Sequence, residues 1–62
     1  MCQSNAYLKH NGEEKLILED VGMIIPQNGK VLLTNIFGEE ELVDGEIKLV
    51  DLIHNKVILE KA

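Results

Sequence analysis

The residue with the richest coordination chemistry in this sequence is its one cysteine, Cys2. A free cysteine often serves only as a small buried hydrophobic side chain, and that interpretation stays open here. The position of Cys2 suggests a second interpretation, that of a metal ligand, because removal of Met1 would give Cys2 both an amine nitrogen and a thiolate. If Met1 is retained, neighbouring backbone amides could supply nitrogen once deprotonated. Thiolate and nitrogen ligands in a plane suit Ni²⁺ or Cu²⁺, so Cys2 is the candidate metal ligand.

One cysteine per chain is too few for a closed metal site, but a twofold dimer would supply two thiolates. A single cysteine also excludes an internal disulfide and any Cys-Cys zinc pattern, and it favours a reducing compartment. We find no basic region followed by a long apolar run, and no apolar stretch near the ~20 residues that span a bilayer. We therefore expect a cytoplasmic protein without a membrane segment.

The other titratable residues give weaker signals. His10 and His54 both precede asparagine in predicted turns, lack the spacing of a paired metal site, and receive no role. The acidic stretch over residues 39–46 is expected to be a solvated surface, with a weak hard-cation site as the alternative. No Ser-His-Asp arrangement, glycine-rich phosphate loop or helical histidine pair is present. We expect a protein that is not an enzyme.

Composition also bears on the choice of partner. Six basic and eleven acidic residues give a net charge of −5, which repels a phosphate backbone. Aromatic residues make up only 3% of the chain, so stacking platforms for nucleic-acid bases are scarce. Both observations disfavour nucleic acid as a partner.

The segments that would position Cys2 have the sequence pattern of β-strands. Cys2 shares its parity with Ala6 and Leu8, as expected for a half-buried first strand over residues 1–9. Asn11-Gly12 and Asn28-Gly29 separate β-like segments and are the strongest hairpin signals in the chain. Further strands or extended pieces are predicted over residues 14–19, 21–27, 30–37, 42–43, 46–53 and 57–60.

These segments predict one all-β domain over residues 1–62, a small antiparallel barrel of five to seven short strands. Gly22 suggests a bulge or a close backbone approach. The expected core residues are Leu8, Leu16, Leu18, Val21, Ile25, Val31, Leu33, Ile47, Leu49 and Val57. Apolar residues also occupy the opposite parity, namely Ile17, Ile24, Leu32 and Ile58, and they suggest that a second face is covered by another chain. Scattered surface aliphatics are the alternative.

The sequence as a whole resembles the CooT-type small nickel-binding proteins, which are accessory proteins of carbon monoxide dehydrogenase. The resemblance covers essentially the entire chain as an ordered set of short matches. These are Met1-Cys2, Glu19-Asp20-Val21, Asn28-Gly29 before Val31, Phe37-Gly38-Glu39-Glu40, Gly45 before Ile47, and Val50-Asp51 to Val57-Ile58-Leu59.

The resemblance implies an SH3-like barrel that forms a homodimer and binds Ni(II) through Cys2. It also implies a partner, either a nickel-recipient enzyme or a maturation factor. The alternative is a small SH3-like barrel that binds RNA or protein, with Cys2 incidental.

Overall fold

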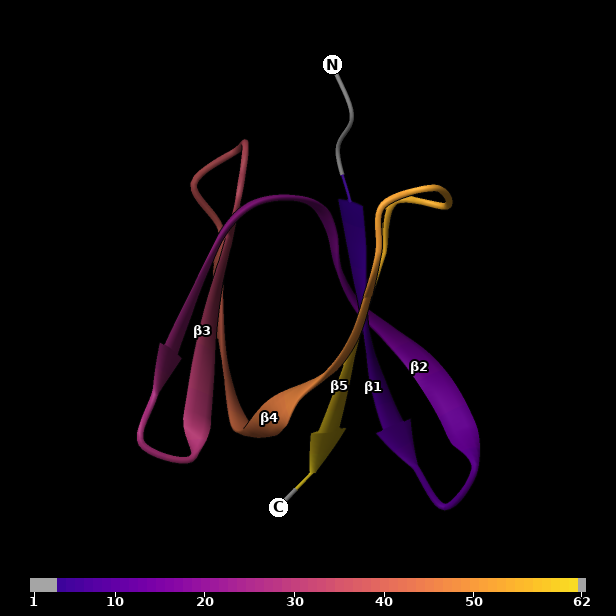
Figure 1. Ribbon diagram of the computed structural model, residues 1–62. Coiled ribbons are helices and arrows are strands. Elements are labelled where there is room, and N and C mark those ends of the chain that lie inside the picture. Colours follow the sequence, from indigo (N-terminus) through magenta and orange to yellow (C-terminus); the bar gives the residue numbers. More distant parts are fainter. Residues whose placement is uncertain (1–3, 62) are drawn as a thin grey trace.

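The computed structural model describes residues 4–61, which form five strands. They are β1 (Ser4–His10), β2 (Glu13–Gln27), β3 (Lys30–Asn35), β4 (Glu40–Asp51) and β5 (Lys56–Lys61). Each strand pairs with the next, and β5 pairs with β1 to close a barrel (Figure 1). The prediction of a small all-β barrel is confirmed. Four pairings are antiparallel, but β1–β5 is parallel, because the first and fifth strands of an up-and-down chain run in the same direction.

Two strands are longer than the sequence predicted, because each bends instead of ending. β2 spans 15 residues and joins the predicted segments 14–19 and 21–27 through Asp20, whose φ is 57°. β4 spans 12 residues and joins segments 42–43 and 46–53 near Gly45. A Cβ atom at Gly45 would clash with the carbonyl oxygen of Glu60. The bend in β2 lets its first half pair with β1 and its second half with β3.

Four register shifts interrupt the pairing of the strands. One lies between Ser4 and Ala6, opposite Glu19 and Asp20, and the other three skip Ile17 and Gly22 in β2 and Lys48 in β4. The bulge predicted at Gly22 is confirmed. The shifts at Ile17 and Lys48 explain why the predicted burial of Leu16 and Leu49 is wrong, since these side chains are 44% and 48% exposed. One extra residue turns the following side chains to the opposite face of a sheet.

The core lies inside the ring of strands. Four predicted core residues are buried, namely Val21, Val31, Leu33 and Val57, and four others, Leu8, Leu18, Ile25 and Ile47, are half-buried. The apolar residues of opposite parity are also partly covered by this single chain. Ile58 is buried, and Ile17, Ile24 and Leu32 are half-buried. Other large apolar side chains remain exposed, and several of them lie at turns. They are Leu16, Met23, Ile36, Phe37, Leu42, Leu49, Val50, Leu52 and Ile53.

Both predicted Asn-Gly hairpins are present. Gly12 has a φ of 80° and Gly29 a φ of 79°, in the left-handed region that glycine adopts without strain. Between β1 and β2, Asn11 also has a positive φ of 52°. In the part of the chain that the structure describes, no helix is long and apolar enough to cross a membrane.

Candidate functional site

Four segments meet at the end of the barrel where the described chain begins (Figure 1). The Asn5 amide donates to the Asn55 carbonyl oxygen at 2.9 Å, and Asn5 Oδ1 accepts from the Asp20 amide at 3.2 Å. The Asp20 carbonyl oxygen in turn accepts from the Ile36 amide at 3.0 Å. We call this end the N-terminal rim, comprising Asn5, Asp20 and the turns 36–39 and 52–55.

Cys2, the predicted metal ligand, lies outside the described residues. Ser4, the first described residue, begins β1 beside Asn55.

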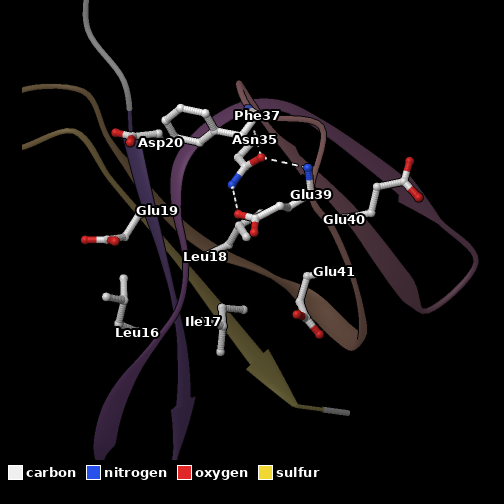
Figure 2. Close-up of a pocket in the computed structure, with 10 residues that line it drawn as sticks. All are labelled: Leu16, Ile17, Leu18, Glu19, Asp20, Asn35, Phe37, Glu39, Glu40 and Glu41. Atoms are coloured by element: carbon white, nitrogen blue, oxygen red, sulfur yellow. Dashed lines mark hydrogen bonds between the residues drawn. The ribbon is translucent and has the colours of Figure 1, made fainter.

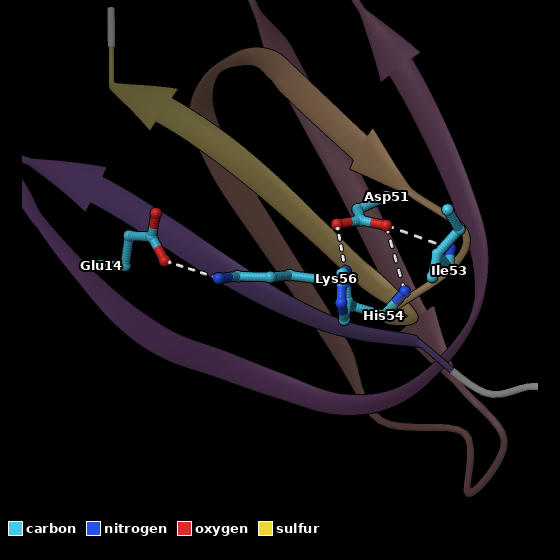
Figure 3. A network of polar contacts seen from close by, with 5 residues as sticks. All are labelled: Glu14, Asp51, Ile53, His54 and Lys56. Atoms are coloured by element: carbon cyan, nitrogen blue, oxygen red, sulfur yellow. Dashed lines mark hydrogen bonds and ion pairs between the residues drawn. The ribbon is translucent and has the colours of Figure 1, made fainter.

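The turn between β4 and β5 is fixed by Asp51, a residue whose local role the sequence analysis did not identify (Figure 3). Its Oδ1 accepts from the amides of Ile53 and His54, at 3.0 and 3.1 Å. Its Oδ2 lies 2.8 Å from His54 Nδ1. These contacts with His54, the side-chain bond first, lower the pKa of Asp51 below its usual 3.8. In the sequence, the three-residue spacing between Asp51 and His54 was the pattern that could have indicated this turn.

The structure separates the two histidines. His54 belongs to the N-terminal rim, whereas His10 ends β1 at the opposite end of the barrel. Both are exposed, as predicted. Across residues 4–61, no group of three or more His, Cys, Asp or Glu side chains is arranged to hold a metal ion.

The rim also carries apolar side chains in contact with solvent. Leu52 and Ile53, at the tip of the β4–β5 turn, are 76% and 88% exposed. Large apolar side chains gathered on a surface often mark an interaction site. This pair lies beside the start of β1, since Asn55 in the same turn binds Asn5.

A polar cross-link behind the rim ties three strands together. Lys56 Nζ of β5 lies 2.9 Å from Glu14 Oε1 of β2 (Figure 3). It also lies 5.2 Å from the centroid of the Tyr7 ring of β1. The hydrogen bond to Glu14 raises the pKa of Lys56 above its usual 10.5. The ammonium bridges the closing strands of the barrel through these two contacts.

The turn between β3 and β4 is organised by a buried side chain, Asn35 (Figure 2). Its Oδ1 accepts from the amides of Phe37 and Glu39, at 3.0 and 2.8 Å. Its Nδ2 donates to Glu39 Oε1 at 2.7 Å. This rigid turn holds Phe37 in a position where its side chain is 72% exposed.

An open groove of about 490 Å³ runs between the first half of β2 and the start of β4. Figure 2 shows Leu16 and Glu19 on one side, Glu40 and Glu41 on the other, and Phe37 near one end. The full lining is Leu16, Ile17, Leu18, Glu19, Asp20, Asn35, Phe37, Glu39, Glu40 and Glu41. The groove thus combines apolar side chains with five carboxylates, a juxtaposition that sequence analysis missed because it depends on how the two strands bend.

Comparison with known proteins places this barrel in a family. A family model described as CO dehydrogenase accessory protein CooT matches residues 1–60. An uncharacterised protein of Methanocaldococcus jannaschii is 40% identical over 60 residues, which cover 97% of this chain and 98% of the relative. The crystal structure of a candidate CooT protein from Carboxydothermus hydrogenoformans matches with a TM-score of 0.90 at 33% identity, over 98% of each chain. Because one model accounts for residues 1–60 and the barrel itself matches, the chain belongs to the CooT family of CO dehydrogenase accessory proteins.

Proposed function

We propose that this protein is a homodimeric, cytoplasmic nickel carrier that binds Ni(II) through Cys2 and delivers it towards carbon monoxide dehydrogenase. The observation that carries the proposal is membership of an accessory family in a chain whose one cysteine is Cys2. A protein of this family serves the enzyme without being the enzyme, so its partner is the enzyme or a factor in its maturation.

Dimerisation is proposed at one side of the N-terminal rim, through the turn 52–55 and not through the turn 36–39. One thiolate and one nitrogen leave a divalent ion half-coordinated, whereas two chains about a twofold axis supply a planar set of four. Leu52 and Ile53 are exposed next to the start of β1, and their burial against a second copy would give the chains a reason to associate there. The same contact would bring the two Cys2 residues within reach of each other.

The first test is the stoichiometry of nickel binding, measured by titration calorimetry and by metal analysis after gel filtration. We expect one Ni(II) per two chains, and loss of binding in Cys2→Ala while the dimer persists. His10→Ala, at the far end of β1, is the matched control and should bind fully. His54→Ala should also bind fully, because the proposed nitrogen ligands are the amine of Cys2 or its neighbouring backbone amides. One metal per chain, or full binding by Cys2→Ala, would contradict the shared site.

The second test concerns association itself. Leu52→Ser with Ile53→Ser should raise the dimer dissociation constant in sedimentation experiments and weaken nickel binding in parallel.

The affinity for nickel should also fall in mild acid, since thiolate and nitrogen ligands must lose protons to bind. Affinity order alone favours Cu²⁺ over Ni²⁺, so selectivity would depend on planar geometry and metal supply.

An RNA- or protein-binding module with an incidental Cys2 is the competing hypothesis. Fluorescence anisotropy with single-stranded RNA discriminates between the two. Nanomolar, salt-sensitive binding that is unchanged in Cys2→Ala would favour the RNA-binding module, whereas the net charge of −5 favours no measurable binding.

A further inference from the structure

The acidic groove carries charge that nothing else in the described chain balances. The lysine ion pairs among residues 4–61 engage the carboxylates of Asp44, Glu60 and Glu14, and the carboxylate of Asp51 contacts His54. None of these lines the groove, and no lysine lines it either. Five carboxylates line one groove, so a cationic occupant would be favoured there.

The groove also offers apolar contact at defined positions. Phe37 is 72% exposed and Leu16 is 44% exposed, and both line it. The hydrogen bonds of Asn35 fix the turn that carries Phe37. Binding through this aromatic ring would therefore cost little additional backbone conformational entropy. Exposed aromatic side chains held on rigid supports are common anchors of protein interfaces.

The backbone along the groove has a free edge. Within the described residues, the first half of β2 pairs only with β1, and pairing with β3 begins at Val21. The other edge of residues 13–18 therefore has no strand partner. Five consecutive residues, 16–20, line the groove, so this edge borders it. An exposed edge can accept an added strand through main-chain hydrogen bonds.

We propose that this groove binds an extended, basic and apolar segment of a partner protein. Its lysine or arginine side chains would face Glu19, Glu40 and Glu41, and its apolar side chains would contact Phe37 and Leu16. A second copy of this chain fits less well, since each copy carries a net charge of −5 and the same acidic groove. The surface goes beyond metal binding and does not depend on Cys2.

The test uses an eight-residue peptide of alternating lysine and leucine, blocked at both ends, titrated into the ¹⁵N-labelled protein. We expect amide shift changes over residues 16–20 and 39–41. Glu19→Gln with Glu40→Gln should weaken binding by about 2- to 30-fold, as expected for two exposed charge pairs. Glu13→Gln with Glu46→Gln removes the same charge outside the groove and is the matched control. Equal weakening by both double variants would overturn the proposal.

Three further measurements separate the parts of the proposal. A peptide N-methylated at alternate residues should bind more weakly if it pairs with β2, and equal binding would refute strand addition. Phe37→Ser should weaken peptide binding about tenfold while leaving the dimer intact. If Phe37→Ser instead abolishes the dimer, the groove belongs to the contact between copies and the proposal fails. Cys2→Ala should keep peptide binding, so failure of the nickel proposal would be seen separately.

Discussion

Replacement of Asn35 by alanine tests whether one buried amide organises the turn between β3 and β4. Asn35→Ala removes three hydrogen bonds, two to the amides of Phe37 and Glu39 and one to Glu39 Oε1. At a net contribution of about 0.5–1.5 kcal/mol each, the free energy of unfolding should fall by about 2–4 kcal/mol. For a chain of this size that corresponds to a decrease in Tm of about 10–30 °C.

The assay combines thermal unfolding, followed by circular dichroism, with amide hydrogen exchange. In Asn35→Ala the amides of Phe37 and Glu39 should lose protection, whereas those of the β1–β5 pairing should lose it only through the global change in stability. An unchanged Tm, together with retained protection at Phe37 and Glu39, would show that Asn35 does not organise the turn.

Two further variants, Asn35→Asp alone and Asn35→Asp with Glu39→Gln, test the same hydrogen bonds. Asn35→Asp keeps the acceptor Oδ1 but places a second carboxylate at the position now 2.7 Å from Glu39 Oε1. Repulsion should raise the pKa of one carboxyl in the folded state, so stability should be highest below the unfolded pKa and fall as pH rises through the raised value. Adding Glu39→Gln restores the donor from the other side and the original net charge. This double variant should recover most of the Tm at pH 7.

The remaining predictions concern the bend, the rim and the core. Gly45→Ala should lower the free energy of unfolding by about 1–3 kcal/mol in denaturant titration, because its methyl group meets the Glu60 carbonyl. Asp51→Asn should lower stability at neutral pH and flatten its acid dependence, because the lowered pKa of Asp51 gives stability that is present above 3.8 and lost as pH falls through the folded value. His54→Gln should show the same loss more weakly in the same pH series, since the backbone donors to Asp51 remain. Leu33→Ala, at a fully buried site, should cost about 2–5 kcal/mol and leave a largely unfolded chain by circular dichroism.

The parts of the fold that sequence predicted are those fixed by local chemistry. Gly12 and Gly29 follow asparagine between β-like segments, and their positive φ angles require no knowledge of the rest of the chain. Gly22 indicated a bulge or a close backbone approach because glycine inside a strand weakens the pairing, and the register shift there is observed. Alternation in the remaining strands was enough to predict a small β barrel and about half of its core.

The parts that sequence did not predict depend on partner strands. Ile17 and Lys48 are ordinary strand residues, and each becomes a bulge only because of its register with a neighbouring strand. For that reason Leu16 and Leu49 were assigned to the wrong face. The role of Asn35 depends on a turn whose hydrogen bonds appear only in three dimensions. Cys2, in contrast, is suggested by residue type and position alone and stays a prediction.

The parallel pairing of β1 with β5 has a consequence for how the barrel is made. The register joins Asn5 to Lys56 and Lys9 to Glu60, so each of these contacts spans about fifty residues of chain. β5 also supplies Val57, Ile58 and Leu59 to the buried set, and the ribosome synthesises it after the other four strands. Closing such long loops before any core contact forms carries an entropic cost that slows folding. The barrel therefore closes only when β5 is available to pair with β1, so closure is a late step that needs the first and the fifth strand at once.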